Sequence, residues 1–292
     1  MRSVQKPNPP TTKPRLVPPP GACDTHLHVY GPTEKYPLSR ERNYTPDLHS
    51  TLDDYLQVHR SLGLQRAIIV TGSANGTNNE VTVDALSRMK GNFKGLALLS
   101  PLIKESELVG LKEAGFTGFR IKANGRGGLS FEDSKKMVAH VRAFEWHVEF
   151  MFESMAEVLD AVSFLKSLEL PYVFDHVAHA APFHNAADRA FSNLLAVLSN
   201  EEHAWINLYS FYQSSKIGPP HYTDMIDVVR SIIEARPDRV IWGSNWPHAG
   251  IAGPMPHDAD LLDFLLAAAP EEDRRKQILA ENPANLYGWR PI

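Results

Sequence analysis

The sequence predicts an α/β fold, and more specifically a single (β/α)8 barrel. Eight short apolar runs alternate with longer segments of helical periodicity along the 292 residues. The runs are almost continuously hydrophobic, as in Ala-Ile-Ile-Val at 67–70, which is typical of strands buried on both faces of a parallel sheet. An open doubly wound sheet is the main alternative, but no Gly-rich dinucleotide fingerprint follows the first run.

The expected strands are Ala22–Val29, Arg66–Thr71, Lys94–Ser100, Thr117–Lys122, His147–Phe152, Tyr172–Val177, Ala204–Tyr209 and Arg239–Asn245. Helix signals lie between them. Thr51 followed by Leu-Asp-Asp predicts a helix start, and Gly63 predicts its end. Further helices are expected over Ser106–Ala114, from Ser130 onward, and over His257–Ala269.

The domain organisation predicted is an N-terminal arm over residues 1–20 and one barrel domain over residues 21–292. The arm contains seven of the 22 prolines, which remove backbone donors and favour extended chain. It is interpreted either as an arm draped over the surface or a partner, or as a disordered segment. It lacks the apolar core of a secretory signal, so a cytoplasmic protein is expected.

Composition excludes several classes of function. Thirty basic residues against 34 acidic ones give a net charge of −4, without the basic surplus of a nucleic-acid binder. No apolar run is long enough to span a membrane. The single cysteine, Cys23, excludes an internal disulfide framework and a Cys-rich zinc site, and is expected to be a core residue. Thirteen histidines remain to be placed.

Two histidines close the first expected strand, in Asp24-Thr-His26-Leu-His28. Because side chains alternate along a strand, His26 and His28 are expected to face the same side, into the barrel mouth. There they can share a metal ion or one substrate oxygen. His176 closes the sixth strand at the same mouth, and its neighbour Asp175 is expected to point the other way.

Two arginines follow the fourth strand. Arg120 lies on an otherwise apolar run and Arg126 in a Gly-rich loop. Arginine matches carboxylates with a two-pronged geometry, which predicts binding of a substrate carboxylate. An internal salt bridge from Arg120 to Glu149 or Glu153 is the competing structural role.

Other polar residues follow the remaining strands. The second is followed by a loop rich in hydroxyl and amide groups, which offers neutral donors to a substrate oxygen. The seventh is followed by a tyrosine and a lysine, and the eighth by Trp-Gly-Ser-Asn-Trp-Pro-His. Function in such barrels lies at the carboxyl ends of the strands. Further candidate substrate-binding residues are therefore Ser73, Thr77, Tyr209, Lys216 and His248, with Asn245 as a candidate catalytic residue.

The ordered motifs resemble the amidohydrolase superfamily. They are Asp24-Thr-His-Leu-His28, Phe119-Arg120, Asp175-His176 and Val240-Ile-Trp-Gly-Ser-Asn-Trp-Pro-His248. The sequence is most similar to the branch of 2-pyrone-4,6-dicarboxylate lactonases and related lactone enzymes, which includes galactarolactone isomerase. The resemblance runs from about Pro19 to Tyr287 and implies a distorted (β/α)8 barrel that acts on a cyclic ester bearing carboxylates.

The resemblance also implies roles for individual residues and a site that works without a metal. Three histidines would contact the scissile carbonyl, and two arginines with a hydroxyl-rich loop would hold a substrate carboxylate. The matching residues are His26, His28 and His176 for the carbonyl, Arg120 and Arg126 for the carboxylate, and Ser73 and Thr77 for the loop.

The sequence departs from the family pattern at Asn245, where the eighth-strand motif usually has an aspartate. An amide neither accepts a proton near neutral pH nor ligates a metal well. Two interpretations follow: hydrolysis of a lactone with a histidine as base, or isomerisation in which a substrate hydroxyl attacks the carbonyl.

Two further alternatives are a hydrolase or decarboxylase with a single divalent metal such as zinc, and a non-catalytic barrel that binds a carboxylate ligand. In the first, the ligands would be His26, His28 and His176. No cofactor is the favoured expectation. The expected partner is a small carboxylated lactone, with no nucleic acid and no membrane, and the oligomeric state is left open.

Overall fold

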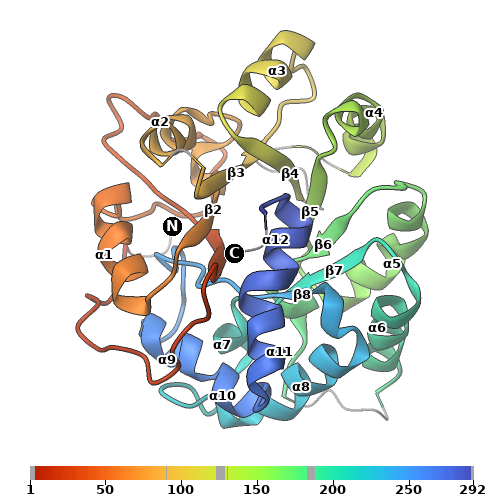
Figure 1. Cartoon of the computed structure of the whole chain (residues 1–292). Coiled ribbons are helices and arrows are strands. Elements are labelled where there is room, and N and C mark those ends of the chain that lie inside the picture. The colour runs from red at the N-terminus through yellow and green to blue at the C-terminus, as the bar shows by residue number, and fades with distance from the viewer. Residues whose placement is uncertain (1–3, 90, 123–128, 130, 183–187, 291–292) are drawn as a thin grey trace.

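The computed structural model describes residues 4–89, 91–122, 129, 131–182 and 188–290. Within them, eight parallel strands follow one another in chain order, each paired with the next. The strands are β1 (Cys23–Leu27), β2 (Arg66–Val70), β3 (Phe93–Leu98), β4 (Phe116–Lys122), β5 (His147–Met151), β6 (Tyr172–Phe174), β7 (Ala204–Asn207) and β8 (Val240–Ile241). Figure 1 shows them around the centre of the molecule, with helices outside. The predicted (β/α)8 barrel is confirmed.

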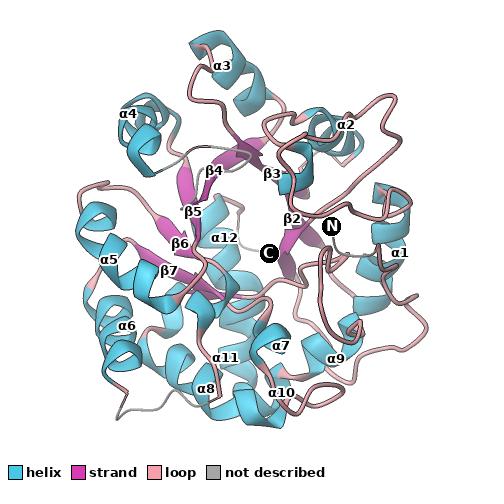
Figure 2. Ribbon diagram, turned by 180° about the vertical axis from the view of Figure 1, so that it is seen from behind, coloured by secondary structure: helices cyan, strands magenta, loops and turns pink. Residues whose placement is uncertain are grey.

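The helices surround the strands, except that the C-terminal helix is seen over the centre of the barrel in Figure 1 and Figure 2. They are α1 (Leu52–Leu62), α2 (Glu80–Arg88), α3 (Glu105–Glu113), α4 (Phe131–Val141), α5 (Met155–Lys166), α6 (Arg189–Asn200), α7 (Phe211–Ser214), α8 (Ile226–Ala235), α9 (Asp258–Asp263), α10 (Leu265–Ala268), α11 (Glu272–Lys276) and α12 (Asn282–Tyr287). The helix expected after Thr51 is α1, capped by Thr51 and ended by Gly63 in the left-handed region at φ 74°. The single helix expected over 257–269 is instead divided into α9 and α10.

Several strands end earlier than the apolar runs predict. The strand expected over Tyr172–Val177 ends at Phe174, and the one expected over Arg239–Asn245 ends at Ile241. After Phe174 the chain passes through four residues with positive φ, at 176–179, and Asn245 also has a positive φ. Period-two alternation holds only in extended backbone, so it does not apply to the residues that follow these strands.

The barrel closes between β8 and β1 through an irregular set of hydrogen bonds. Thr25 donates its backbone N–H to Trp242, at 3.0 Å, and Asn245 donates its own to His26, at 2.8 Å. Gly243 lies between these contacts. A Cβ there would lie 2.8 Å from the backbone nitrogen of His26, so only glycine allows this close approach. The seam therefore positions both His26 and Asn245.

Hydrophobic residues fill the structure in two places. A small cluster inside the barrel includes Cys23, Ile68, Ile241 and Tyr287 of α12. A much larger cluster lies between the strands and the surrounding helices. Cys23 is fully buried, and burial raises the pKa of its thiol, which agrees with its expected place in the core.

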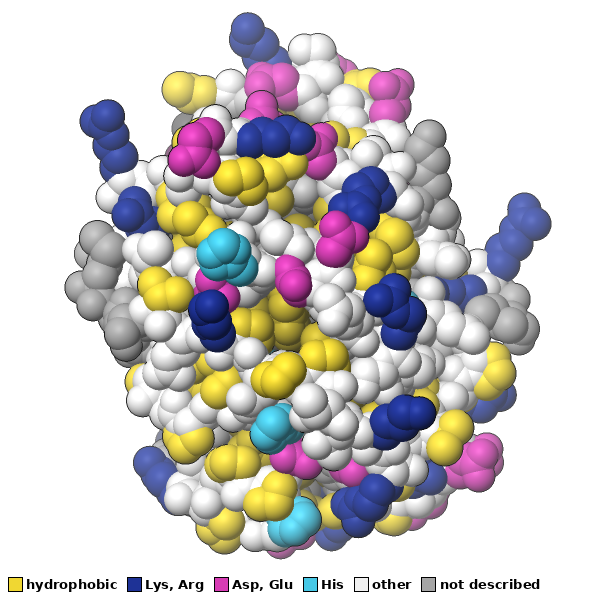
Figure 3. Space-filling view, turned by 90° about the vertical axis from the view of Figure 1, so that its left-hand side faces the viewer, with side chains coloured by type: hydrophobic (Ala, Val, Ile, Leu, Met, Phe, Trp, Pro, Cys, Tyr) yellow, Lys and Arg dark blue, Asp and Glu magenta, His cyan; other side chains and the backbone are white. Residues whose placement is uncertain are grey.

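The described part of the N-terminal arm lies along the surface beside residues 255–263. Asn8 donates to the carbonyl of Met255, at 2.8 Å, and the backbone N–H of Leu16 donates to Asp263, also at 2.8 Å. Basic and acidic side chains are interspersed on the face that Figure 3 shows. Among the described residues, no helix has both the length and the apolar character needed to cross a membrane.

Candidate active site

A cavity of about 340 Å³ lies where the carboxyl ends of several strands meet. Such a volume is in the range that binds small molecules. Its described lining consists of His28, Asn43, Tyr44, Ser73, Arg120, Met151, His176, Gln213, Asn245, Ala249 and Gly250. The cavity therefore brings together five residues that the sequence singled out, from four different strand ends and one loop. Among the lining residues described, Arg120 is the one with a permanent charge.

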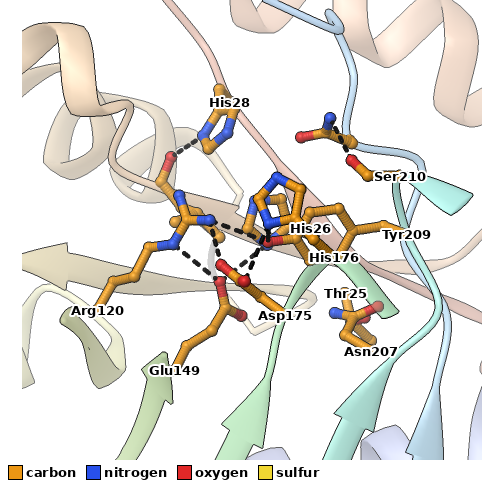
Figure 4. Close-up of polar contacts among 12 residues, drawn as sticks. Thr25, His26, His28, Arg120, Glu149, Asp175, His176, Asn207, Tyr209 and Ser210 are labelled. Carbon is orange, nitrogen blue, oxygen red and sulfur yellow. Dashed lines mark hydrogen bonds and ion pairs between the residues drawn. The ribbon is translucent and has the colours of Figure 1, made fainter. Parts of the chain in front are cut away.

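The charge of Arg120 is used largely inside the protein. Arg120 Nε lies 3.3 Å from Oε1 of Glu149, and Nη2 donates both to Asp175 and to the hydroxyl of Tyr209. Figure 4 shows both carboxylates on the same side of the guanidinium, with a contact from it to each. The internal salt bridge expected as an alternative role for Arg120 is confirmed for Glu149. Nε and Nη2 are thus engaged by Glu149, Asp175 and Tyr209.

Asp175 points into this cluster, so the expectation that it faces away from His176 is wrong. Its Oδ1 lies 2.9 Å from Nδ1 of His176. The reason is that β6 ends at Phe174 and His176 has a φ of 48°, which turns both side chains to the same side. Burial would raise the pKa of Asp175, but His176 and Arg120 more than offset it and hold the pKa below its usual range. An ionised Asp175 beside Nδ1 favours the tautomer of His176 that carries its hydrogen there, and in that tautomer Nε2 is an acceptor.

His28 and His26 occupy different places, and a hydrogen bond fixes the tautomer of His28. His28 lines the cavity, and its Nδ1 donates to the carbonyl of Val70, at 2.8 Å, so Nε2 is an acceptor. His26 is fully buried, with Nδ1 3.1 Å from Glu149 and its ring stacked on Tyr209 at 3.8 Å between centroids. Burial and nearby positive groups lower the pKa of both histidines well below the ordinary value. Both are therefore neutral near pH 7.

Asn245 presents an oxygen to the cavity. Its Nδ2 donates to Ser210 Oγ, at 2.9 Å, and to the hydroxyl of Tyr212, at 3.0 Å. Both amide hydrogens are thus used inside the protein, and the carbonyl oxygen is what the side chain offers a ligand. Asn245 adopts a φ of 63°, a region that asparagine tolerates better than most residues.

A second wall of the cavity comes from loops that follow β1 and β2. Ser73 Oγ lies 3.4 Å from the hydroxyl of Tyr44, which in turn lies 2.9 Å from the hydroxyl of Tyr30. Sequence reasoning missed Tyr44 and its neighbour Asn43. Both lie in the long connection between β1 and α1, and no local pattern shows that this segment folds over the mouth.

Several predicted site residues lie elsewhere. Thr77 and Lys216 are exposed and are not among the described residues that line the cavity. Tyr209 is buried beneath the cavity, 3.2 Å from His176 Nδ1. His248 is buried, and both its ring nitrogens contact other side chains. Arg126 lies outside the described residues.

Potential metal ligands near the cavity lie beside a cationic side chain. Among the described residues, no group of three or more histidine, cysteine or acidic side chains is arranged to hold one. The Arg120 guanidinium lies within the cluster formed by Glu149, Asp175 and His176, where it would repel a cation. After the eighth strand, where the family pattern has an aspartate, Asn245 offers a neutral amide oxygen.

Comparison with known proteins identifies the family of the chain. The sequence profile of the family described as Amidohydrolase matches residues 23–289. The chain belongs to the amidohydrolase family. The predicted family resemblance is therefore confirmed over almost the whole chain.

Relatives within the family are enzymes named for lactones. A 4-sulfomuconolactone hydrolase of Hydrogenophaga intermedia is 34% identical over 279 residues, which cover 94% of this chain and 91% of the relative. D-galactarolactone isomerase of Agrobacterium fabrum is 28% identical over 285 residues and 96% of each chain. A crystal structure of an Agrobacterium tumefaciens protein, in its apo form, superimposes with a TM-score of 0.84 at 27% identity, covering 96% of this chain and 100% of that one. The expectation of a lactone enzyme of this family agrees with these relatives.

Proposed function

We propose that this protein is a lactone isomerase that acts on a polyhydroxylated, carboxylate-bearing lactone. The observation that carries the proposal is the orientation of Asn245, whose amide hydrogens are held by Ser210 and Tyr212 so that its oxygen faces the cavity. A neutral acceptor at this position can orient a substrate hydroxyl but cannot take its proton. The lactone relatives support the class of substrate.

The reaction needs a group that moves one proton, and His176 is placed for it. Asp175 holds Nδ1, so Nε2 accepts the proton of the attacking hydroxyl. The hydroxyl oxygen forms a bond to the lactone carbonyl carbon, and the original ring C–O bond breaks. The proton on Nε2 then passes to the departing alkoxide oxygen. The reaction is balanced without water, and an internal nucleophile lowers the demand on the base.

Negative charge on the carbonyl oxygen develops in the tetrahedral state. We assign its stabilisation to Nη1 of Arg120, because Nε and Nη2 are occupied by Glu149, Asp175 and Tyr209. This departs from the sequence-based expectation that the whole guanidinium binds a carboxylate. The scheme uses no metal ion at any step.

The remaining lining groups favour a hydroxylated substrate. His28 Nε2 and Asn245 Oδ1 accept hydrogen bonds, and the hydroxyls of Tyr44 and Ser73 both donate and accept them. Neutral groups of this kind match sugar hydroxyls and one carboxylate better than a flat dicarboxylate, which would call for several cations.

Hydrolysis is the second candidate function. It is favoured by the same Asp175–His176 pair, because an imidazole held in this tautomer also takes a proton from water. The 34% identical relative carries the name of a hydrolase. Isomerisation is preferred because the carboxylate that would share this task is replaced by Asn245.

A panel of sugar-acid and pyrone-type lactones, with product detection by mass spectrometry and NMR in 18O-labelled water, tests the proposal. Isomerisation gives a product of unchanged mass, with no 18O and with new proton signals. A product heavier by one labelled water would show hydrolysis and overturn the isomerase assignment. Saturable binding without turnover of any lactone would favour the non-catalytic barrel. Loss of turnover in His176→Asn checks that the activity belongs to this site.

A further inference from the structure

Four buried side chains form a hydrogen-bonded line that ends at the cavity. Asp258 Oδ1 lies 3.1 Å from Nε2 of His248, whose Nδ1 lies 2.8 Å from the hydroxyl of Tyr212. The Tyr212 hydroxyl lies 3.0 Å from Nδ2 of Asn245. Each of these residues is more than nine-tenths buried. We call this set, Asp258, His248, Tyr212 and Asn245, the His248 relay.

The chemistry of the two ends fixes every hydrogen in between. A carboxylate only accepts, so His248 carries its hydrogen on Nε2 and Nδ1 is an acceptor. The Tyr212 hydroxyl must then donate to Nδ1, and burial raises its pKa to about 12, so it keeps that hydrogen. Its oxygen is left to accept from Asn245 Nδ2. With a neutral imidazole beside Asp258, Tyr212 is therefore the donor to His248 and the acceptor from Asn245.

We propose that Asp258 and His248 are positioning residues that determine which atom of Asn245 faces the substrate. Their tautomer holds the amide nitrogen inward and the carbonyl oxygen toward the cavity. The inference rests on the proposed function, since it explains how a neutral side chain presents an acceptor for a substrate hydroxyl. It also assigns His248, which the sequence predicted to bind substrate, to the support of Asn245.

Asp258→Asn tests the relay with little change in shape. An asparagine at 258 can donate to Nε2 of His248, which moves the imidazole hydrogen to Nδ1. Tyr212 then accepts from His248, and its hydroxyl hydrogen becomes available to the carbonyl oxygen of Asn245. This favours an amide turned so that its nitrogen faces the cavity. Asp263→Asn is the matched control, because Asp263 lies at the other end of α9 and bonds Arg15 and Leu16 outside the relay.

The primary readout is the tautomer of His248, measured by 15N NMR and assigned with a His248→Gln sample. The wild-type protein and Asp263→Asn are expected to show hydrogen on Nε2, and Asp258→Asn to show it on Nδ1. An unchanged tautomer in Asp258→Asn overturns the proposal. This readout requires no substrate, so it remains decisive if no lactone is converted and the proposed function fails.

Turnover gives the second readout. Asp258→Asn is expected to lower kcat for isomerisation about tenfold or more, while its Tm matches that of Asp263→Asn within the error. Tyr212→Phe, which removes the same acceptor without altering α9, is expected to lower kcat similarly and keeps the test open if Asp258→Asn does not fold. Wild-type kcat in both variants would overturn the positioning role even if the tautomer moves.

The double variant Asn245→Asp with Asp258→Asn checks the coupling between the two ends. It moves the carboxylate from one end of the relay to the other. A hydrogen on Nδ1 of His248 then suits both an asparagine at 258, which donates to Nε2, and Tyr212, which accepts from Nδ1 and donates to the new carboxylate. We expect that tautomer in the double variant, and hydrogen on both ring nitrogens in Asn245→Asp alone. Identical His248 spectra in the two variants would show that the ends are not coupled.

Discussion

Nδ1 of His176 lies 2.9 Å from Oδ1 of Asp175, although the two residues are adjacent in sequence and alternation would send them to opposite sides. The left-handed backbone at His176 brings them together. Arg120 binds the other carboxylate oxygen of Asp175, so the aspartate stays ionised and the imidazole stays in one tautomer. The proton-transfer chemistry of the site depends on this pair.

Asp175→Asn is expected to lower kcat on the preferred lactone about 100-fold or more, since general-base catalysis of this kind contributes ~10²–10⁴-fold. The amide no longer fixes the hydrogen on Nδ1 of His176. Steady-state kinetics measure the effect, with Asp160→Asn on the exposed side of α5 as control. A kcat within twofold of wild type would remove His176 and Asp175 from the proton-transfer step.

Arg120→Met is expected to lower the free energy of unfolding by about 3–5 kcal/mol, because it leaves the buried carboxylate of Asp175 without its cation. Denaturant unfolding followed by circular dichroism measures the change. Adding Asp175→Asn to Arg120→Met is expected to restore part of the loss by removing the unpaired charge, since burial raises the pKa of Glu149 to about 8 and leaves Asp175 as the ionised partner. If the single variant is as stable as wild type, the guanidinium does not balance the charge of Asp175 as the geometry indicates.

Gly243→Ala is expected to lower the free energy of unfolding by about 1–3 kcal/mol and to reduce turnover as well. The added methyl would press on the backbone of His26 at the seam between β1 and β8. Gly110→Ala on α3 is the control, because nothing lies within 4 Å of a Cβ there. That helical substitution is expected to stabilise by roughly 0.5–1 kcal/mol. Equal melting temperatures for the two variants would contradict a tight seam.

His147 predicts a pH-dependent part of the stability. The residue is buried at the start of β5, and burial lowers its pKa from 6.5 to about 4. Below pH 6.5 the unfolded chain binds a proton that the folded protein does not, so the free energy of unfolding falls as the pH drops from 6.5 to 4. The loss from this group amounts to about 3 kcal/mol.

Unfolding curves between pH 4 and 7 measure that effect as the difference between wild type and His147→Gln. The same substitution at the partly exposed His203 controls for the loss of an imidazole. Parallel stability curves for wild type and His147→Gln would show that His147 is protonated equally in both states.

The loop walls of the cavity were beyond prediction for a simple reason. Tyr44 and Asn43 lie in the connection between β1 and α1, and their place at the mouth depends on contacts with distant segments such as Ser73. Thr77 and Lys216 carry suitable chemistry, but the chain turns them to the surface. Residue type alone does not distinguish these two outcomes.

The sequence by itself determined the parallel barrel. Apolar runs alternate along the chain with segments of helical periodicity, and each pattern reflects which side chains of that local segment are buried. It also placed His28, Arg120, His176 and Asn245 at one end, because strands of a barrel all point the same way. Only the tertiary structure decided what these residues do. The direction of Asp175 follows from backbone that leaves the extended region, and the pairing of Arg120 and of His248 joins groups from separate elements of the chain. Such contacts carry no signature in residue spacing, because they are set by how the closed barrel brings its strand ends together.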